Sequence, residues 1–215
     1  MRGMRRLNEL STILIGLSLI ATLTACPNLL VETGKKALED RSTDDQVTDT
    51  KLAASITTDL TKKDKSLLLD VSTDVWEQRV LLTGAVSDPH VKQEIVAMVR
   101  ADARVRTLYD EIQIVSPEEQ TERRKAAQEK EQGEPKKEGV SQTVNDFWIE
   151  TKISARLVTE PDVRSVNFRW RSVRNTVYII GRSRSEAELQ RVLEICKSVD
   201  GVIAVMSFVE VRPVK

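Results

Sequence analysis

The feature that most constrains the fold of this 215-residue chain is an internal repeat. Each copy opens with three apolar residues at helical spacing: Leu52, Ile56 and Leu60 in the first, and Ile149, Ile153 and Leu157 in the second. Two strand-like runs follow and end at Gly84 or Gly181. That glycine lies 21 residues before Val105 in one copy and 21 before Val202 in the other. The matched spacing indicates two related units.

Each copy continues with a second helix and a last strand. Asp88 and Pro89 predict the start of one helix, and Ser185 with Glu188 forms a capping box at the start of the other. The last strands are expected over 105–115 and 202–211. The order helix-strand-strand-helix-strand predicts an α+β fold with two small two-layer domains. We place them at 47–115 and 143–215, each near the lower size limit for folding alone.

The first 25 residues have the pattern of a secretory signal peptide. An apolar run from Ile13 to Ala25 follows the basic residues Arg2, Arg5 and Arg6, and it is too short for an ordinary transmembrane helix. The run ends in Leu-Thr-Ala-Cys, which resembles the lipobox of bacterial lipoproteins. That resemblance implies cleavage before Cys26 and lipidation of its thiol. A simple secretory signal and an uncleaved N-terminal anchor are the alternatives.

The residues after Cys26 bear on localisation. In lipoproteins an aspartate at the next position favours retention in the inner membrane, and this chain has Pro27 there. The resemblance therefore implies an outer-membrane lipoprotein that faces the periplasm. Residues 26–46 contain few large apolar side chains, so we predict a lipidated polar tether.

Composition argues against several classes of function. Lys+Arg and Asp+Glu both number 33, so no charge excess points to nucleic acid. One histidine, His90, and one spare cysteine, Cys196, make a metal site or a Cys–His nucleophile improbable. No glycine-rich phosphate loop and no Gly-x-Ser-x-Gly motif is present. We therefore expect a protein that is not an enzyme and has no cofactor, no metal and no small-molecule substrate.

Both repeats resemble the BON domain of bacterial periplasmic and outer-membrane proteins. The second copy contains the family's Val-x-Gly-Val turn as Val199–Val202, whereas the first has Ala103–Val105 without the glycine. Asp40–Ser42, Gln46 and Asn145–Lys152 strengthen a match to lipoproteins that carry two BON domains. The resemblance implies binding of anionic phospholipid and support of envelope integrity.

Residues 116–142 separate the repeats and are rich in Glu, Lys, Gln and Arg. We expect a transient helix over Glu118–Glu131 within an otherwise flexible charged linker. A linker of this kind leaves the arrangement of the two repeats unfixed.

The neutral total charge hides two unlike halves. Residues 45–115 carry nine basic and twelve acidic side chains, a net charge of −3, and residues 143–215 carry twelve and nine, a net charge of +3. A basic residue near an anionic bilayer contributes about 1 kcal/mol, so the second repeat is the candidate for lipid binding.

The helix that opens the second repeat gives a more specific prediction. Ile149, Ile153 and Leu157 form its core stripe, which leaves an outward face with aromatic, apolar and basic residues. Such a face suits a membrane interface. Packing of Trp148 on the first repeat, stapling of the helix start and a different helix phase are the alternatives. The predicted lipid-binding residues are Phe147, Trp148, Thr151, Lys152, Ala155, Arg156 and Val158.

The outer face of the second sheet is unusually apolar for a solvated surface. Alternation along a predicted strand from Val163 to Arg171 and along the next two strands places its residues on the side away from the helices. Docking of the two repeats through this face, an external envelope protein partner, and no role all remain open. A protein-interaction or chaperone-like module is accordingly the alternative function. The face comprises Arg169, Arg171, Tyr178, Ile180, Met206 and Phe208. Trp76, near a hairpin turn, receives no role.

Overall fold

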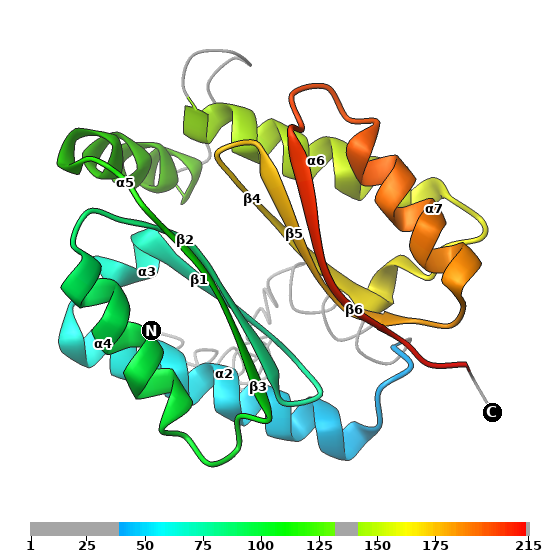
Figure 1. Ribbon diagram of the computed structural model, residues 1–215, viewed down its shortest axis with the longest axis horizontal. Coiled ribbons are helices and arrows are strands. Elements are labelled where there is room, and N and C mark those ends of the chain that lie inside the picture. Colours follow the sequence, from blue (N-terminus) through cyan, green and yellow to red (C-terminus); the bar gives the residue numbers. More distant parts are fainter. Residues whose placement is uncertain (1–38, 132–141, 214–215) are drawn as a thin grey trace, which may run out of the picture. The chain divides into compact units, whose positions relative to one another are not determined.

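The computed structural model describes residues 39–131 and 142–213 (Figure 1). The first repeat contains a long helix, a short helix, a β-hairpin, a third helix and a last strand. Its elements are α2 (Thr43–Lys63), α3 (Leu67–Asp70), β1 (Val71–Trp76), β2 (Arg79–Val86), α4 (Pro89–Arg100) and β3 (Thr107–Ile114). The connecting helix α5 (Pro117–Glu131) follows.

The second repeat has the same order of strands and long helices. Its elements are α6 (Gln142–Thr159), the 3₁₀ turn η1 (Ser165–Asn167), β4 (Phe168–Val173), β5 (Thr176–Ser183), α7 (Glu186–Lys197) and β6 (Ala204–Val211). Equivalent positions differ by 97 in residue number throughout the strands, as Arg79 and Thr176 illustrate. The predicted strand from Val163 was wrong at its start, because 165–167 form η1 and β4 begins at Phe168.

Both sheets confirm the α+β prediction. In each, the first two strands are antiparallel and the third strand pairs parallel with the second, in the orders β1-β2-β3 and β4-β5-β6. A parallel neighbour requires a crossover, and α4 and α7 supply it. The predicted helical stripes lie in the two cores: Leu52, Ile56 and Leu60 in one, and Ile149, Ile153 and Leu157 in the other.

A buried aspartate caps the hairpin turn in each repeat. Glu77 and Gln78 have φ of 49° and 62°, and their amides donate to the Asp49 carboxylate at 2.6 and 2.8 Å. Arg174 and Asn175 have φ of 51° and 63°, and their amides donate to a second aspartate at 2.9 and 2.8 Å. Two successive positive φ values are typical of the tight turn that suits a twisted hairpin. The second aspartate is Asp146.

In each repeat, a glycine on the second strand allows the backbone just before the first strand to pass close to it. Gly84 has φ of +128°, and a Cβ there would lie 2.0 Å from the Asp70 carbonyl oxygen. Gly181 has φ of +153°, and its Cβ would lie 2.1 Å from the Asn167 carbonyl oxygen. No side chain fits at that distance, so the two glycines found in the sequence are required by sterics.

The outer faces of the two sheets pack against each other. Trp76 and Leu81 of the first repeat share a buried cluster with Tyr178 and Ile180 of the second. Tyr109 and Phe208 also pack there, with ring centroids 4.5 Å apart. Trp76 is fully buried in this cluster, so the absence of a predicted role for it was wrong.

A buried arginine joins the same two sheets. Arg79 is fully buried, and its guanidinium donates to the Phe208 and Gly181 carbonyl oxygens, each at 2.7 Å. Its Nε lies 3.4 Å from a Glu210 carboxylate oxygen. A buried cation is stable only with such partners, so Arg79 fixes the second sheet against the first.

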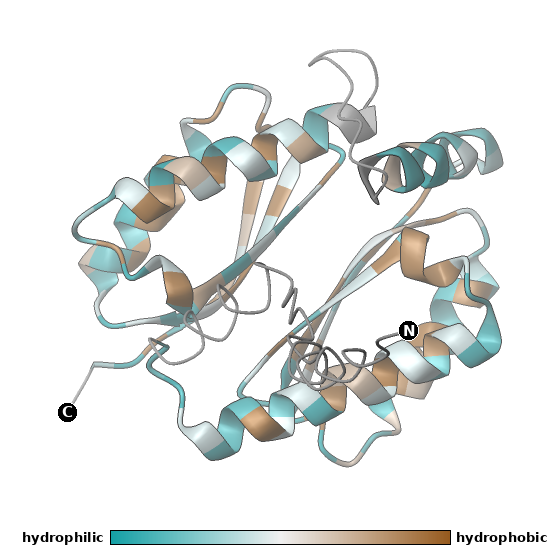
Figure 2. Cartoon of the chain, turned by 180° about the vertical axis from the view of Figure 1, so that it is seen from behind, coloured by the Kyte–Doolittle hydropathy of each residue, from teal (hydrophilic) through white to brown (hydrophobic). Residues whose placement is uncertain are grey.

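Helix α5 differs from the expected flexible linker. Figure 2 shows it as predominantly hydrophilic, yet its polar side chains hold it on the first repeat. Arg124 donates bidentately to Asp70, with 2.8 Å from its Nε, and Gln120 accepts from the Ser87 amide at 3.0 Å. The predicted helix over Glu118–Glu131 is therefore confirmed, but it is docked on the first repeat and not transient, because specific ion pairs replace the missing apolar face.

The predicted tether also differs where the structure describes it. Glu39, Asp40 and Arg41 make fixed contacts, and Ser42 caps α2 by accepting from the Asp45 amide at 3.0 Å. The predicted signal peptide and Cys26 lie outside the described residues. Within the described ranges, no helix is long and apolar enough to cross a membrane.

Candidate functional site

The candidate site is the outward surface of α6. Its start is fixed by Asp146, which accepts from the Ser172 hydroxyl at 2.8 Å as well as from the turn amides. Glu150 accepts from the Ser172 amide at 2.9 Å. Trp170 donates its indole N–H to the Glu150 carbonyl oxygen at 3.3 Å. These contacts hold α6 on the sheet and determine which of its residues face outward.

The predicted lipid-binding residues lie on that outward surface to different degrees. Thr151, Ala155, Arg156 and Val158 are exposed, with 65% of Val158 accessible. Phe147, Trp148 and Lys152 are half-buried. The Phe147 and Trp148 rings meet edge to face with centroids 5.5 Å apart.

Arg156 does not extend freely from α6. Its Nη1 donates to the Ser198 carbonyl oxygen at 3.0 Å and to the Ser198 hydroxyl at 2.7 Å. Ser198 is the C-cap of α7, where a cation is favoured by the helix dipole. Arg156 therefore carries an exposed positive charge in a fixed position.

Helix α2 occupies the equivalent place in the first repeat and offers a matched comparison. The residues 97 positions earlier contain no aromatic or large apolar side chain, and only one of them is basic. Trp148 is matched by Lys51, and Val158 is matched by Thr61. Of the two matched sets, only the one on α6 contains aromatic and large apolar residues, although α2 exposes Val47 near its start. The matched α2 residues are Thr50, Lys51, Ala54, Ser55, Thr58, Asp59 and Thr61.

The outer sheet face, in contrast, is largely covered. Tyr178, Ile180 and Phe208 pack against the first repeat, and the Tyr178 hydroxyl accepts from Gln113 Nε2 at 2.8 Å. Burial raises the pKa of Tyr178. Met206, at the edge, remains 43% exposed.

The sequence matches the BON-domain family over residues 48–116 and 145–213. The chain belongs to the BON-domain family. Its first and second repeats are the first and second BON domains, and BON domains are non-catalytic binding domains associated with phospholipid or membrane binding. The finding supports a dual BON-domain protein.

Similar proteins were found in two bacteria. A protein of Anaplasma centrale, named an uncharacterized protein in the gshII 5′ region, is 29% identical over 142 residues, which cover 66% of this chain and 82% of that protein. Two structures of CdsD, a structural protein of the type III secretion system of Chlamydia trachomatis, are 12% and 14% identical, with TM-scores of 0.29 and 0.28. They cover 75% and 67% of this chain and 93% and 91% of the CdsD chains, the second being the C-terminal domain.

The basic excess of the second BON domain is used largely inside the protein. Its arginines face acids of the first half at the junction of the sheets: Arg171 lies 3.1 Å from Asp74, and Arg212 lies 3.0 Å from Glu77. Arginines in such ion pairs are not available to bind lipid phosphate on a membrane-facing surface. The net charge of +3 is therefore weaker support for lipid binding than the sequence indicated. The further arginines paired with acids from outside the second domain are Arg164, Arg169, Arg174, Arg182 and Arg184.

The Cys196 thiol is buried in the core of the second domain. Burial raises the pKa of the Cys196 thiol to about 12, so it stays protonated at neutral pH. Across 39–131 and 142–213, no group of three or more His, Cys, Asp or Glu residues is arranged to hold a metal ion.

Sequence reasoning missed the two turn-capping aspartates. Asp49 and Asp146 also receive an arginine each: Arg41 donates to Asp49 at 2.6 Å, and Arg123 to Asp146 at 3.3 Å. The signal was available, because an aspartate stands at the same position of both repeats.

Proposed function

We propose that this protein is a lipid-anchored outer-membrane lipoprotein that binds anionic phospholipid through α6 of its second BON domain. The observation that carries the proposal is the difference between α6 and α2. Both helices cover equivalent sheets, but only α6 combines Phe147 and Trp148 with exposed Val158 and flanking cations. Aromatic rings suit headgroup depth, and cations suit phosphate.

The sequence supports a more specific relationship. A lipobox followed by two BON domains resembles DolP, the division- and outer-membrane-stress-associated lipid-binding lipoprotein. We propose on this basis that the protein faces the periplasm and supports envelope integrity.

The proposed mechanism is attachment at two points. Acyl chains at Cys26 supply the first, with about 0.8 kcal/mol for each buried CH₂. Helix α6 supplies the second, to which each basic side chain adds about 1 kcal/mol on an anionic surface. The anchor raises the effective concentration of α6 at the bilayer, so a weak second contact suffices.

The alternative, a protein-interaction or chaperone-like module, would use the outer sheet face of the second BON domain. Tyr178, Ile180 and Phe208 are buried against the first BON domain, and this favours the lipid proposal. An external partner of that face would have to displace Trp76 and Leu81.

Vesicle flotation tests the second contact. The mature chain with Cys26→Ser, which lacks the lipid but keeps residues 26–46, is mixed with anionic or zwitterionic vesicles. We expect binding to anionic vesicles only, with a steep loss at high salt. Trp148→Ala should weaken binding about tenfold, whereas Lys51→Ala at the matched site of α2 should have less than a twofold effect. Absence of flotation on either vesicle would contradict the proposal.

Lipidation is tested separately. Cells that express the full chain should incorporate labelled palmitate into it and hold it in the outer-membrane fraction. Cys26→Ser should abolish both. Retention of the label in that variant would place the modification elsewhere.

A further inference from the structure

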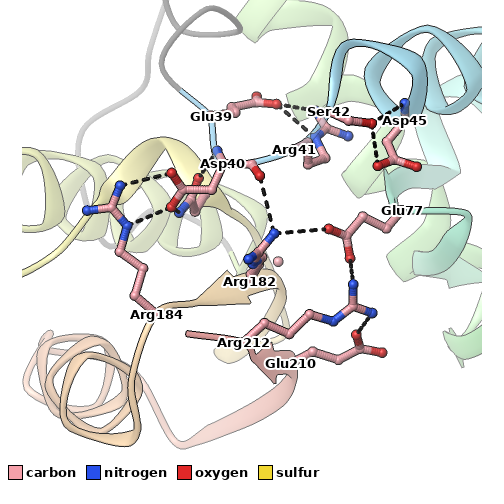
Figure 3. A network of polar contacts seen from close by, with 12 residues as sticks. Glu39, Asp40, Arg41, Ser42, Asp45, Glu77, Arg182, Arg184, Glu210 and Arg212 are labelled. Atoms are coloured by element: carbon pink, nitrogen blue, oxygen red, sulfur yellow. Dashed lines mark hydrogen bonds and ion pairs between the residues drawn. The ribbon is translucent and has the colours of Figure 1, made fainter. Parts of the chain in front are cut away.

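Glu39, Asp40 and Arg41, which lie in the predicted tether and are called the leader below, contact both BON domains. Figure 3 shows the contacts of Asp40 with Arg182 and Arg184 of the second domain. Arg41 donates to Asp49 of the first domain at 2.6 Å, and its guanidinium lies 4.1 Å from the centroid of the Trp76 ring. Glu39 pairs with Arg169 of the second domain. The Arg41 side chain is only 6% exposed, so this contact is an internal one.

Asp40 lies in a cradle on the second domain. Its carboxylate accepts from Arg184 at 2.7 and 2.9 Å and from Asn167 Nδ2 at 2.6 Å. Its amide donates to Asn167 Oδ1 at 2.9 Å, and Arg164 lies 3.5 Å away. Arg182 donates to its carbonyl oxygen at 3.2 Å. A bidentate guanidinium and a paired amide form a site of defined geometry for a carboxylate.

Helix α5 makes the corresponding contacts on the opposite side. Arg123 pairs with Asp146 of the second domain, while Arg124 pairs with Asp70 of the first. Asp70 and Asn167 are equivalent positions, as are Ser87 and Arg184, because each pair differs by 97. The leader and α5 therefore bridge the two domains in a reciprocal manner.

The charges of the two bridges are opposite. The first domain presents the acid Asp70 to a basic segment of α5, and the second presents Arg184 and Arg164 to an acid of the leader. Exchange of the two segments would place Asp40 against Asp70. Like charges at these sites disfavour the wrong docking, as specific recognition requires.

We propose that Glu39–Arg41 is a clamp, that Arg184, Asn167 and Arg164 form its carboxylate-binding site, and that its docking keeps the core around Trp76 closed. The ligand of the site is the leader itself. The clamp does not depend on lipid binding. In an anchored protein it leaves thirteen residues, 26–38, between the lipid and the clamp, a span of at most about 45 Å.

Trp76 supplies a direct reporter of closure. Its indole Nε1 is buried and has no hydrogen-bond partner among the described residues, so solvent exchange of its proton requires the inter-domain core to open. Trp170 is the internal control, because its indole bonds to Glu150 within the second domain.

The experiment follows indole proton exchange by NMR in the mature Cys26→Ser chain without lipid. The variants are Asp40→Asn, Arg184→Gln and the double variant. Each single change should speed Trp76 exchange about tenfold, equivalent to about 1.4 kcal/mol of closing free energy. The double variant should add little, because both changes remove one contact. Trp170 exchange should stay unchanged.

Arg191→Gln is the matched control, since Arg191 pairs with Glu160 away from the clamp. It should leave Trp76 exchange unaltered. Unchanged Trp76 exchange in the clamp variants would overturn the proposal. Equal acceleration of Trp76 and Trp170 would also overturn it, because that result indicates loss of domain stability, as would additive effects in the double variant. The absence of lipid keeps this result independent of the proposed membrane contact.

Discussion

The two BON domains share a backbone and differ in what they present. Equivalent residues are 97 apart, both hairpins turn under a buried aspartate, and both sheets need a glycine at the same site. Outward residues differ: Lys51 on α2 is replaced by Trp148 on α6. The comparison shows that a few buried positions specify the shared fold, while the exposed residues differ between the two domains.

The difference in charge between the domains has a structural use. The acids Asp74 and Glu77 of the first domain meet arginines of the second around the shared core. Opposite net charges thus favour pairing of unlike domains over pairing of like ones.

The strongest test of the shared frame is a pair of glycine substitutions. Gly84→Ala and Gly181→Ala should each cost about 4 kcal/mol, because the new Cβ meets a backbone carbonyl oxygen and φ is positive. Urea unfolding of the two variants measures the loss. Gly201→Ala, with its nearest atom 3.5 Å away, should cost only about 1 kcal/mol. A clear difference between the losses of unfolding free energy in Gly84→Ala and Gly181→Ala would show that the two domains are not equivalent at this site.

The next test uses two matched core positions whose side chains differ in size. Trp76 and Val173 occupy matched positions in it, but Trp76 has the larger buried side chain. Trp76→Ala should cost about 3 kcal/mol and Val173→Ala about 1.5 kcal/mol in unfolding free energy. Because the cluster around Trp76 joins the two domains, Trp76→Ala should let them unfold in separate transitions. A neutral Trp76→Ala would argue against a closed core.

The turn-capping aspartates should show a smaller, nearly equal effect. Asp49→Asn and Asp146→Asn each retain one acceptor for two turn amides and lose an ion pair, so each should cost about 2 kcal/mol. Thermal unfolding measures both. Asp49→Asn should in addition loosen Arg41, which is visible as faster exchange of the Trp76 indole. Loss of stability in only one variant would show that the turns are not equivalent.

The smallest expected effect concerns pH. Hydrogen bonds from Arg184, opposed by burial and helped by Asn167, lower the pKa of Asp40 from 3.8 to about 2. A lowered folded-state pKa stabilises the fold above the unfolded value, and this contribution is lost as pH falls from about 4 to about 2. Wild type should exceed Asp40→Asn by about 1 kcal/mol at pH 6, and the gap should close by pH 2. Chemical denaturation across this range checks it. A constant gap would mean that the carboxylate charge is not involved.

Local sequence patterns predicted the helices and the turn glycines, but not the contacts between charged residues that lie far apart in the sequence. The stripes at Ile149 and Leu52 and the glycines could be located because helices and hairpins leave periodic signals. Docking of α5 depends on Arg124 and Asp70, which are 54 residues apart, and no periodicity reports such a pair. Asp40 is noted in the sequence only for the family resemblance, because its partners Arg184 and Asn167 lie 144 and 127 residues away in the sequence.

The candidate site was predicted in part. The outward position of Thr151, Ala155 and Val158 follows from helix phase. The hydrogen bonds of Arg156 to Ser198 and the pairing of Arg171 with Asp74 could not be inferred, because they depend on how separate elements pack.

The central claim is that only the second BON domain meets the membrane although both share one frame. The most direct measurement is paramagnetic broadening of backbone amide resonances by a spin-labelled headgroup in anionic bicelles. The account predicts broadening at Thr151, Ala155 and Val158 and none at the matched Ala54, Thr58 and Thr61. Equal broadening of α2 and α6, or broadening of α2 alone, would contradict it.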